Sequence, residues 1–380
     1  MQPVWLSGWY FFYFAFIGAY LPYFGLYLES IGLDASQIGI LMSVGQLMRM
    51  LVPALWGWLS DRSGRRGPWI RGSVAVATVA FGGYLTADAF FPLLLVSVVL
   101  HLFWSASLPL VEALTFAHLG RAADRYARIR LWGSIGFIVA VGGIGQLLEG
   151  RPLSDLLWYS WALLGLTFAM SVKLAETSSP VPVAVSGVAR ELREPRVVAL
   201  MIAGFCMAAA HGPLYVFYSI HLAASGYDTA LIGMLWSLGV IAEIGVFIAM
   251  PRLNRRFDVR TTLVACFALA VLRFLLIGWM ADGLLVLVFA QMLHGATFGA
   301  HHAATVGALN RWFVPAHQGT VLAIYGSLSF GAGGMLGALL SGVLWDSAGA
   351  GVTFTVGAAF AAAGLLFAVL RLPAESLAVR

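Results

Sequence analysis

Charged residues are scarce in this sequence, since only 10% of its 380 residues are Asp, Glu, Lys or Arg, whereas 61% are hydrophobic and 13% aromatic. An ordinary soluble domain carries about 25% charged residues, so this composition excludes that class of protein. We therefore expect a chain that uses the lipid bilayer as its solvent.

Cysteine is rare as well, and the chemistry-bearing patterns of enzymes are absent. Cys206 and Cys266 both fall in apolar runs, which leaves neither a disulfide framework nor the thiol spacing of a metal site. We find no nucleophile beside a base, no phosphate-binding loop and no metal-ligand spacing. The sequence therefore predicts a protein that is not an enzyme and that holds no metal and no organic cofactor.

The apolar runs predict an all-α membrane protein with twelve transmembrane helices. Most runs reach the roughly 20 residues that a helix needs to cross a hydrocarbon core of about 30 Å. The first run begins at Trp5 without a basic segment or a cleavage site, so we interpret it as a helix rather than a signal peptide. The expected spans are 6–28, 38–59, 70–87, 91–117, 131–148, 156–174, 197–223, 231–250, 262–281, 284–308, 319–343 and 351–371.

The basic residues gather on one side of these spans. If both termini are cytoplasmic, all of them except Arg49, Arg151 and Arg273 fall in cytoplasmic segments. This asymmetry follows the positive-inside rule and explains the net charge of +5 without a nucleic-acid partner. We expect a multi-pass protein of a bacterial-type inner membrane, with both termini in the cytoplasm.

The chain reads as two similar halves. A polar segment with three prolines, 176–196, separates a six-helix bundle of residues 1–175 from a second one of residues 197–380. At an offset of 194 residues, Gly32, Asp34, Ile38, Gly39, Leu41, Ser43 and Gly45 match Gly226, Asp228, Ile232, Gly233, Leu235, Ser237 and Gly239. Parallel repeats of this kind are typical of secondary transporters, whose substrate site lies near the bilayer midplane between halves that rock to alternate access.

A loop motif carries a family resemblance. Residues 57–66 read Gly-Trp-Leu-Ser-Asp-Arg-Ser-Gly-Arg-Arg, which resembles the signature that follows the second helix of major facilitator superfamily transporters. The resemblance implies the major facilitator fold. It also implies that Asp61 and Arg62 latch helix ends during conformational change and do not bind substrate.

A closer resemblance covers nearly the whole chain. Residues 130–134 (RLWGS), 226–227 (GY) and 235–240 (LWSLGV) with Glu243 are similar to the phenylpropionate permease group, which is related to the lactose permease and other oligosaccharide:proton symporters. The resemblance implies the same twelve-helix fold and import of the substrate. Helix 5 also lacks the motif of drug:proton antiporters, which argues against export.

Several residues resemble functional positions of the lactose permease. Residues 109–113 (PLVEA) and 128–130 (RIR) are similar to its sugar-site motifs, which implies substrate-binding roles for Glu112 and Arg130. Arg273 and His294 resemble members of its proton-coupling cluster. The carboxylate one turn beyond that histidine is replaced, because residues 294–297 read His-Gly-Ala-Thr, so the family's principal proton carrier has no counterpart at this position.

Arg49, Glu112, Glu243 and Arg273 are charged residues inside expected spans, where each costs about 2.5–3.5 kcal/mol at a helix centre. The repeat makes Arg49 and Glu243 equivalent, so the two can close a gate as a pair, or Arg49 can hold a substrate carboxylate. A permanent ion pair, or pairing of Glu243 with Arg273, would explain the same charges. We favour Glu243 as a proton-coupling residue, because an apolar setting holds the carboxyl proton and a nearby arginine controls its release.

Two helical stripes extend the candidate site. Helix 4 places His101, Ser105, Leu108 and Glu112 on one face, from which Glu112 can reach Arg130, with Trp132 as a stacking surface. A structural link between helices 4 and 5 would give the same pattern. Helix 10 places His294 and His301 on one face, where they can relay protons or be held by ordinary hydrogen bonds. Tyr20 and Tyr215 lie on tyrosine stripes that suit either an aromatic substrate or an interfacial belt.

These features favour proton-coupled import of a small organic solute, most plausibly an aromatic monocarboxylate such as 3-phenylpropionate, with the proton as coupling ion. A sugar or nucleoside:proton symporter is the alternative, because Glu112, Arg130 and Trp132 fit a sugar site. A non-transporting membrane sensor with the transporter fold is an alternative of another class. We expect the lipid bilayer and the small-molecule substrate as partners, and a monomer by family analogy.

Overall fold

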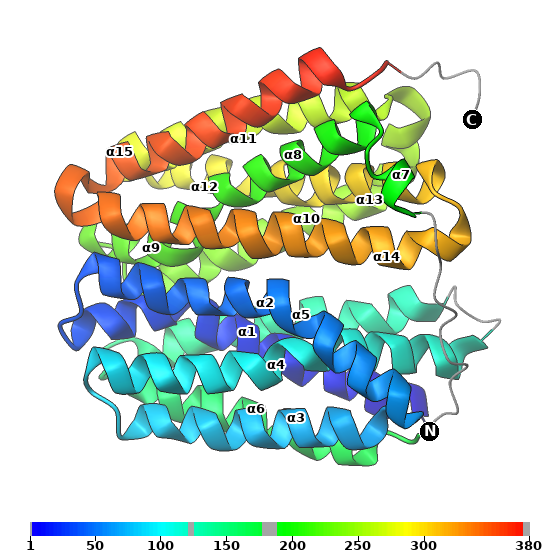
Figure 1. The fold of residues 1–380 in the computed structure, drawn as a ribbon. Helices are drawn as coiled ribbons and strands as arrows, with labels where there is room; N and C mark the ends of the chain where they lie inside the picture. Colours follow the sequence, from blue (N-terminus) through cyan, green and yellow to red (C-terminus); the bar gives the residue numbers. More distant parts are fainter. Residues whose placement is uncertain (1, 121–124, 177–187, 375–380) are drawn as a thin grey trace. The chain divides into compact units, whose positions relative to one another are not determined.

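The computed structural model describes residues 2–120, 125–176 and 188–374, and this part of the chain is helical without β-strands (Figure 1). The chain divides into two compact units, Met1–Val183 with Tyr227–Met234, and Ala184–Gly226 with Leu235–Arg380. One boundary between the units, after Val183, falls inside the expected linker 176–196, and the other two enclose Tyr227–Met234. Residues 177–187 of that linker lie outside the described residues, and the short helix α7 (Val188–Glu191) follows them.

Six long helices make up the described part of the first unit. Helix α1 packs against two later helices, α5 and α6, while α4 lies between α2 and α3 (Figure 1). Pro22 and Pro53 lie inside α1 and α2 without ending them. The elements are α1 (Gln2–Ser30), α2 (Ala35–Ser63), α3 (Gly67–Phe81) continued by the 3₁₀ turn η1 (Gly82–Leu85), α4 (Phe90–Leu119), α5 (Tyr126–Leu148) and α6 (Asp155–Lys173).

The second unit contains interrupted helices. Its first span breaks at His211, and two later spans each contain a π-helical segment, a feature that is frequent at functional sites. The elements are α8 (Pro195–Ala210), α9 (Gly212–Ala224), α10 (Thr229–Arg256), α11 (Val259–Trp279), α12 (Leu284–Met292), η3 (Gly295–Ala300), α13 (His301–Trp312), α14 (Pro315–Gly326), η4 (Ser327–Gly333) and α15 (Gly334–Arg371).

The prediction of twelve spans is confirmed. Ten helical segments of the described residues are long and apolar enough to cross a membrane. The last of them, Pro315–Arg371, covers 57 residues, and Gly349 divides it into two spans because its backbone leaves the helix there, with φ 80° and ψ 174°. Helix α3 with η1 supplies the remaining span. Several helices extend a few residues beyond the apolar runs, since a helix continues into the polar interface.

The sequence repeat is present in the backbone. Gly32 and Gly226 both have a φ of 88°, a left-handed conformation that favours glycine, and each ends a helix. Two residues later, the Asp34 carboxylate accepts from the N–H of Gln37 at 2.8 Å and the Asp228 carboxylate accepts from the N–H of Leu231 at 2.7 Å. The same turn therefore begins α2 in one half and α10 in the other.

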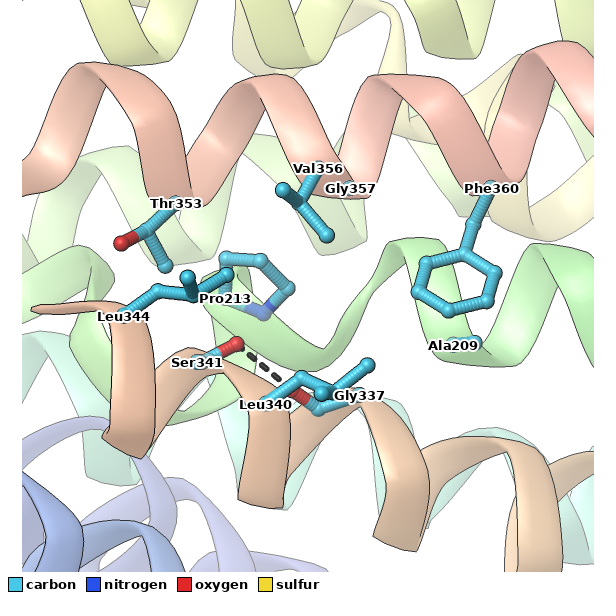
Figure 2. A pocket seen from close by; sticks show the side chains of 10 residues that line it. All are labelled: Ala209, Pro213, Gly337, Leu340, Ser341, Leu344, Thr353, Val356, Gly357 and Phe360. Atoms are coloured by element: carbon cyan, nitrogen blue, oxygen red, sulfur yellow. Dashed lines mark hydrogen bonds between the residues drawn. The ribbon is translucent and has the colours of Figure 1, made fainter. Parts of the chain in front are cut away.

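Glycine contacts set the helix spacing within each unit. A Cβ added to Gly136 of α5 would lie under 3.0 Å from the Phe11 carbonyl of α1, and one added to Gly337 of α15 would meet the Ala209 carbonyl of α8 in the same way. Figure 2 shows this second seam, where Pro213 and Gly337 face each other across a narrow apolar gap. Small residues allow these helices to approach closely, as in other membrane proteins.

Candidate functional site

Arg273 of α11 is the centre of a polar cluster in the second unit, and its side chain is 0% exposed. Its Nε donates to the Ala290 carbonyl at 2.9 Å, and its Nη2 donates to Oε1 of Gln291 at 3.1 Å. Its Nη1 donates to Oγ1 of Thr297 at 3.1 Å and faces Nε2 of His211 at 3.4 Å. Within the described residues, the hydrogen bonds of this guanidinium therefore go to groups on α12, η3 and the break between α8 and α9.

The break that positions His211 follows from the residues after it. Gly212 and Pro213 begin α9, and proline has no N–H to continue the ladder of α8. His211 has φ −81° and ψ −6°, and its Nδ1 lies 2.8 Å from the Met207 carbonyl. The ring is buried and packs edge-on against Phe274, with 5.1 Å between ring centroids.

Glu243 of α10 reaches the same cluster through His294. Its Oε2 lies 3.9 Å from Nε2 of His294, and its side chain is 19% exposed. Helix α10 packs close to η3 because Gly295 and Gly299 have no Cβ. A Cβ on Gly295 would meet the Ala242 carbonyl at 2.7 Å, and one on Gly299 would meet Cγ of Glu243 at 3.1 Å. Two glycines spaced four residues apart in η3 thus bring a carboxylate against a histidine.

Aromatic rings border the cluster on one side. Tyr215 stacks between His211, with 5.8 Å between ring centroids, and Trp236, with 6.3 Å. The indole N–H of Trp236 donates to Oγ of Ser219 at 3.0 Å, which fixes the indole ring. Phe298 stacks on the other histidine, His294, at 5.4 Å. The predicted residue Tyr215 therefore adjoins the predicted residues Arg273 and His294.

His301 lies further along the same span as His294. Its ring is buried, packs edge-on against Phe267 at 5.3 Å, and its Nε2 has no hydrogen-bond partner within the described residues. Phe298 separates it along the chain from His294. The predicted stripe is therefore present, whereas its role in proton relay stays a prediction.

In the first unit, the predicted pair Glu112 and Arg130 is joined by a residue that the sequence did not single out. Oε1 of Glu112 accepts from the Tyr126 hydroxyl at 3.0 Å. The Arg130 guanidinium lies over the Phe14 ring, 3.9 Å from its centroid, and is close enough to interact electrostatically with Glu112. Because Tyr126 and Arg130 are one turn apart on α5, both lie on the face that meets α4 and α1.

The stacking surface predicted at Trp132 does not share a helix face with Arg130, and its role stays a prediction. Residues two apart on a helix point in nearly opposite directions, so Trp132 leaves the face that carries Arg130. The indole is 47% exposed, and it borders a groove of about 490 Å³ that is otherwise lined by α1. The groove residues are Pro3, Val4, Ser7, Gly8, Phe11, Phe12 and Trp132.

Tyr20 belongs to an aromatic core and not to an exposed surface. It is 7% exposed, stacks on Phe24 at 4.3 Å, and its hydroxyl lies 3.5 Å from that of Tyr84. Its ring is therefore covered in this structure, and its contact with a substrate stays a prediction. Arg49, in contrast, is exposed halfway along α2. Its predicted pairing with Glu243 joins the two units and stays a prediction.

The loop motif begins at the end of α2 and runs to the start of α3. Arg62 lies over the Trp58 ring at 5.5 Å, while the side chain of Asp61 is outside the described residues. Beyond the motif, the two carboxylate oxygens of Glu176 accept from the N–H groups of Arg66 at 2.9 Å and Gly67 at 2.8 Å. A carboxylate at a helix N-terminus stabilises it, so Glu176 anchors α3 from the end of α6.

The sequence places His211 on the same helical face as Tyr215 but gives no role to Gln291, Thr297, Tyr126 or Glu176. The position of His211 at a helix break is also readable, because it directly precedes Gly-Pro inside an apolar span. The others depend on which helices meet. Within the described residues, no three His, Cys, Asp or Glu side chains gather as metal ligands.

Comparisons with known proteins agree with this arrangement. The chain is 29% identical over 357 residues to the probable 3-phenylpropionic acid transporter of Escherichia coli (strain K12), covering 92% of each protein. It is 24% identical to the maltose permease of Geobacillus stearothermophilus, covering 82% of this chain and 79% of the relative. The crystal structure of the nucleoside transporter NupG superposes with a TM-score of 0.81 at 18% identity, covering 97% of each chain, which shows the shared fold.

The family follows from a match over most of the sequence. The model of the MFS_1 like family matches residues 4–356, which include the loop motif, the cluster around Arg273 and most of both repeats. The chain is therefore a multi-pass membrane transporter of the MFS_1 like family, within the major facilitator superfamily.

Proposed function

We propose that this transporter imports an aromatic monocarboxylate, such as 3-phenylpropionate, together with protons across a bacterial inner membrane. The observation that carries the proposal is the relative at 29% identity over 92% of both chains, a probable 3-phenylpropionic acid transporter. The cluster in the second unit supports proton coupling, because Glu243, His294 and His211 are groups that can take up protons beside a buried arginine.

An organic anion also suits the charges of the spans. Arg49 places a cation halfway along an apolar helix, and a cation in a membrane span is a group that can attract a substrate carboxylate. Tyr215 is half-buried beside His211, and its aromatic ring suits an aromatic substrate. Symport then follows if substrate and proton must both be bound before the halves change conformation.

The experiment is uptake of labelled 3-phenylpropionate into proteoliposomes that are acidic outside. We expect accumulation that a protonophore abolishes and that unlabelled sugars and nucleosides do not inhibit. Liposomes without protein are the control, because a weak acid crosses lipid unaided. Uptake that the protein does not increase would refute the substrate assignment. Uptake that the protonophore does not reduce would refute proton coupling.

A sugar or nucleoside substrate is the second candidate. The Glu112–Tyr126–Arg130 group supports it, since a carboxylate, a phenol and a guanidinium can bind sugar hydroxyls. A maltose permease is among the relatives and a nucleoside transporter among the structural neighbours. Inhibition of the uptake above by maltose or by a nucleoside, with Glu112→Gln reducing that inhibition, would favour this candidate. Ligand binding without flux would instead favour a sensor.

A further inference from the structure

The hydrogen bonds of His211 determine which ring nitrogen carries the proton. Nδ1 lies 2.8 Å from the Met207 carbonyl, and a carbonyl only accepts, so Nδ1 must donate. Nε2 lies 3.4 Å from Nη1 of Arg273, and a guanidinium only donates, so Nε2 must accept. His211 is therefore neutral in this structure, with its proton on Nδ1 and its lone pair directed at Arg273.

A second proton on His211 is incompatible with this contact. The proton would have to bind Nε2, the same atom that accepts from Arg273, and it would place two N–H donors and two positive charges opposite each other. Both side chains are buried, 2% and 0% exposed, so little solvent screens the repulsion. Protonation of Nε2 and the Arg273 contact are thus mutually exclusive.

The contact also lies at a break between two helices, where its loss can change the angle between them. His211 is the residue between α8 and α9, and Gly212 and Pro213 follow it. Arg273 keeps its hydrogen bonds to Ala290, Gln291 and Thr297 on the neighbouring span whether or not His211 is present. When the contact breaks, the junction of α8 and α9 therefore loses its hydrogen bond to α11, while His221 still holds the far part of α9 to the Ile277 carbonyl of α11. One donor of Arg273 then becomes available to an anion.

We propose that His211 is a proton-sensitive latch that fastens the break between α8 and α9 to Arg273 while neutral and releases it on protonation. The inference rests on the proposed proton coupling and adds the residue that converts proton uptake into helix movement. His211 is a positioning residue, since no substrate need touch it. The titratable and charged groups around it are Arg273 on α11, Tyr215 on α9, and His294 and His301 on the span that contains η3.

The first test is spectroscopic and does not depend on a substrate. The full-length protein, with ¹⁵N-labelled histidine in lipid nanodiscs, contains eight histidines, and the signal of His211 is the one missing in His211→Gln or His211→Asn. We expect a protonated Nδ1 and an unprotonated Nε2 at neutral pH. A proton on Nε2 at neutral pH would overturn the latch.

The second test asks whether transport needs a titratable group at position 211. His211→Gln keeps an acceptor for Arg273 but cannot titrate, so the latch should stay closed. Exchange and gradient-driven uptake of labelled 3-phenylpropionate should both fall to the rates of protein-free liposomes. His221→Gln is the matched control, because His221 lies on α9 and faces the Ile277 carbonyl instead, 3.0 Å away.

The outcomes distinguish the two proposals. Accumulation by His211→Gln equal to that of the unmodified protein would overturn the latch and leave proton symport intact. If uptake by the unmodified protein does not depend on the proton gradient, the proposed function fails. The NMR measurement still decides whether the His211 ring that contacts Arg273 is neutral and protonated on Nδ1.

Discussion

Individual residues in this transporter are defined by partners that lie far away in the sequence. Hydropathy indicated that Arg273 and Glu243 lie inside helices, and pairing between them was one expectation. Arg273 instead satisfies its donors on Ala290, Gln291, Thr297 and His211, while Glu243 faces His294. Charge alone could not predict which partners Arg273 and Glu243 contact, because these contacts depend on the close approach of α10 to η3.

The surroundings of Arg130 also depend on geometry at this scale. The motif that opens α5 suggested an arginine and an aromatic ring acting together, whereas helical geometry points Arg130 and Trp132 to different faces. Tyr126, one turn before Arg130, is the aromatic residue that bonds Glu112. The substrate-binding roles of these residues stay predictions.

Substitution of Arg273 by lysine should destabilise the protein although the charge is kept. Lysine cannot reproduce the planar fork that bonds Ala290, Gln291 and Thr297 together, and each lost bond to a charged group costs about 1.5–3 kcal/mol. Thermal unfolding in detergent, followed by tryptophan fluorescence, should show a lower Tm. Arg128→Lys, at an exposed position of α5, serves as the control and should unfold like the unmodified protein.

Replacing Glu243 by glutamine should abolish uphill uptake while exchange continues. Glutamine retains the size and polarity of the side chain opposite His294 but cannot carry a proton. Uptake driven by a proton gradient and exchange at equal pH would be measured on the same proteoliposomes. Glu149→Gln, at the exposed end of α5, is the control, and full accumulation by Glu243→Gln would contradict the coupling role.

At the scale of helices, hydropathy was sufficient to locate the spans but not their internal breaks. All twelve expected runs correspond to helices or to consecutive helical segments. The break at His211 has a local cause in Gly212 and Pro213. The π-helical segments η3 and η4, in contrast, are rich in glycine and alanine, and such stretches are equally compatible with an ordinary α-helix until a neighbouring helix packs against them.

The close contact of α1 with α5 gives a prediction with a control in the same helix. Gly136→Ala should lower stability and yield, because its Cβ would lie under 3.0 Å from the Phe11 carbonyl. Gly143→Ala places a Cβ where nothing lies within 4 Å and should be neutral or stabilising by about 0.4–1 kcal/mol. Equal Tm values for the two variants would show that this contact does not limit helix spacing.

For the whole molecule, the repeat and the charge asymmetry were readable from the sequence, and the matched turns at Gly32 and Gly226 agree with them. Substrate identity was not readable, because members of one family differ in a few side chains on the same scaffold. The related proteins named above include a transporter of an aromatic acid and one of a sugar.

The orientation in the membrane is a prediction about the complete chain. A membrane-impermeant maleimide should label Ser154→Cys on intact cells, and should label Ala127→Cys only after permeabilisation, since basic residues surround the latter position. Both positions are exposed, and the native Cys206 and Cys266 are buried, so background labelling should be low. The reverse labelling pattern would place the termini outside.

The break at Gly349 has a consequence for biogenesis. The last two spans follow each other within α15, and Gly349 is the residue between them that leaves the helical conformation. A ribosome-bound chain therefore offers the insertion machinery no polar loop to hold on one side while the first of these spans enters the bilayer. The two spans are expected to insert together, as a single hairpin, after the rest of the protein is already in the membrane.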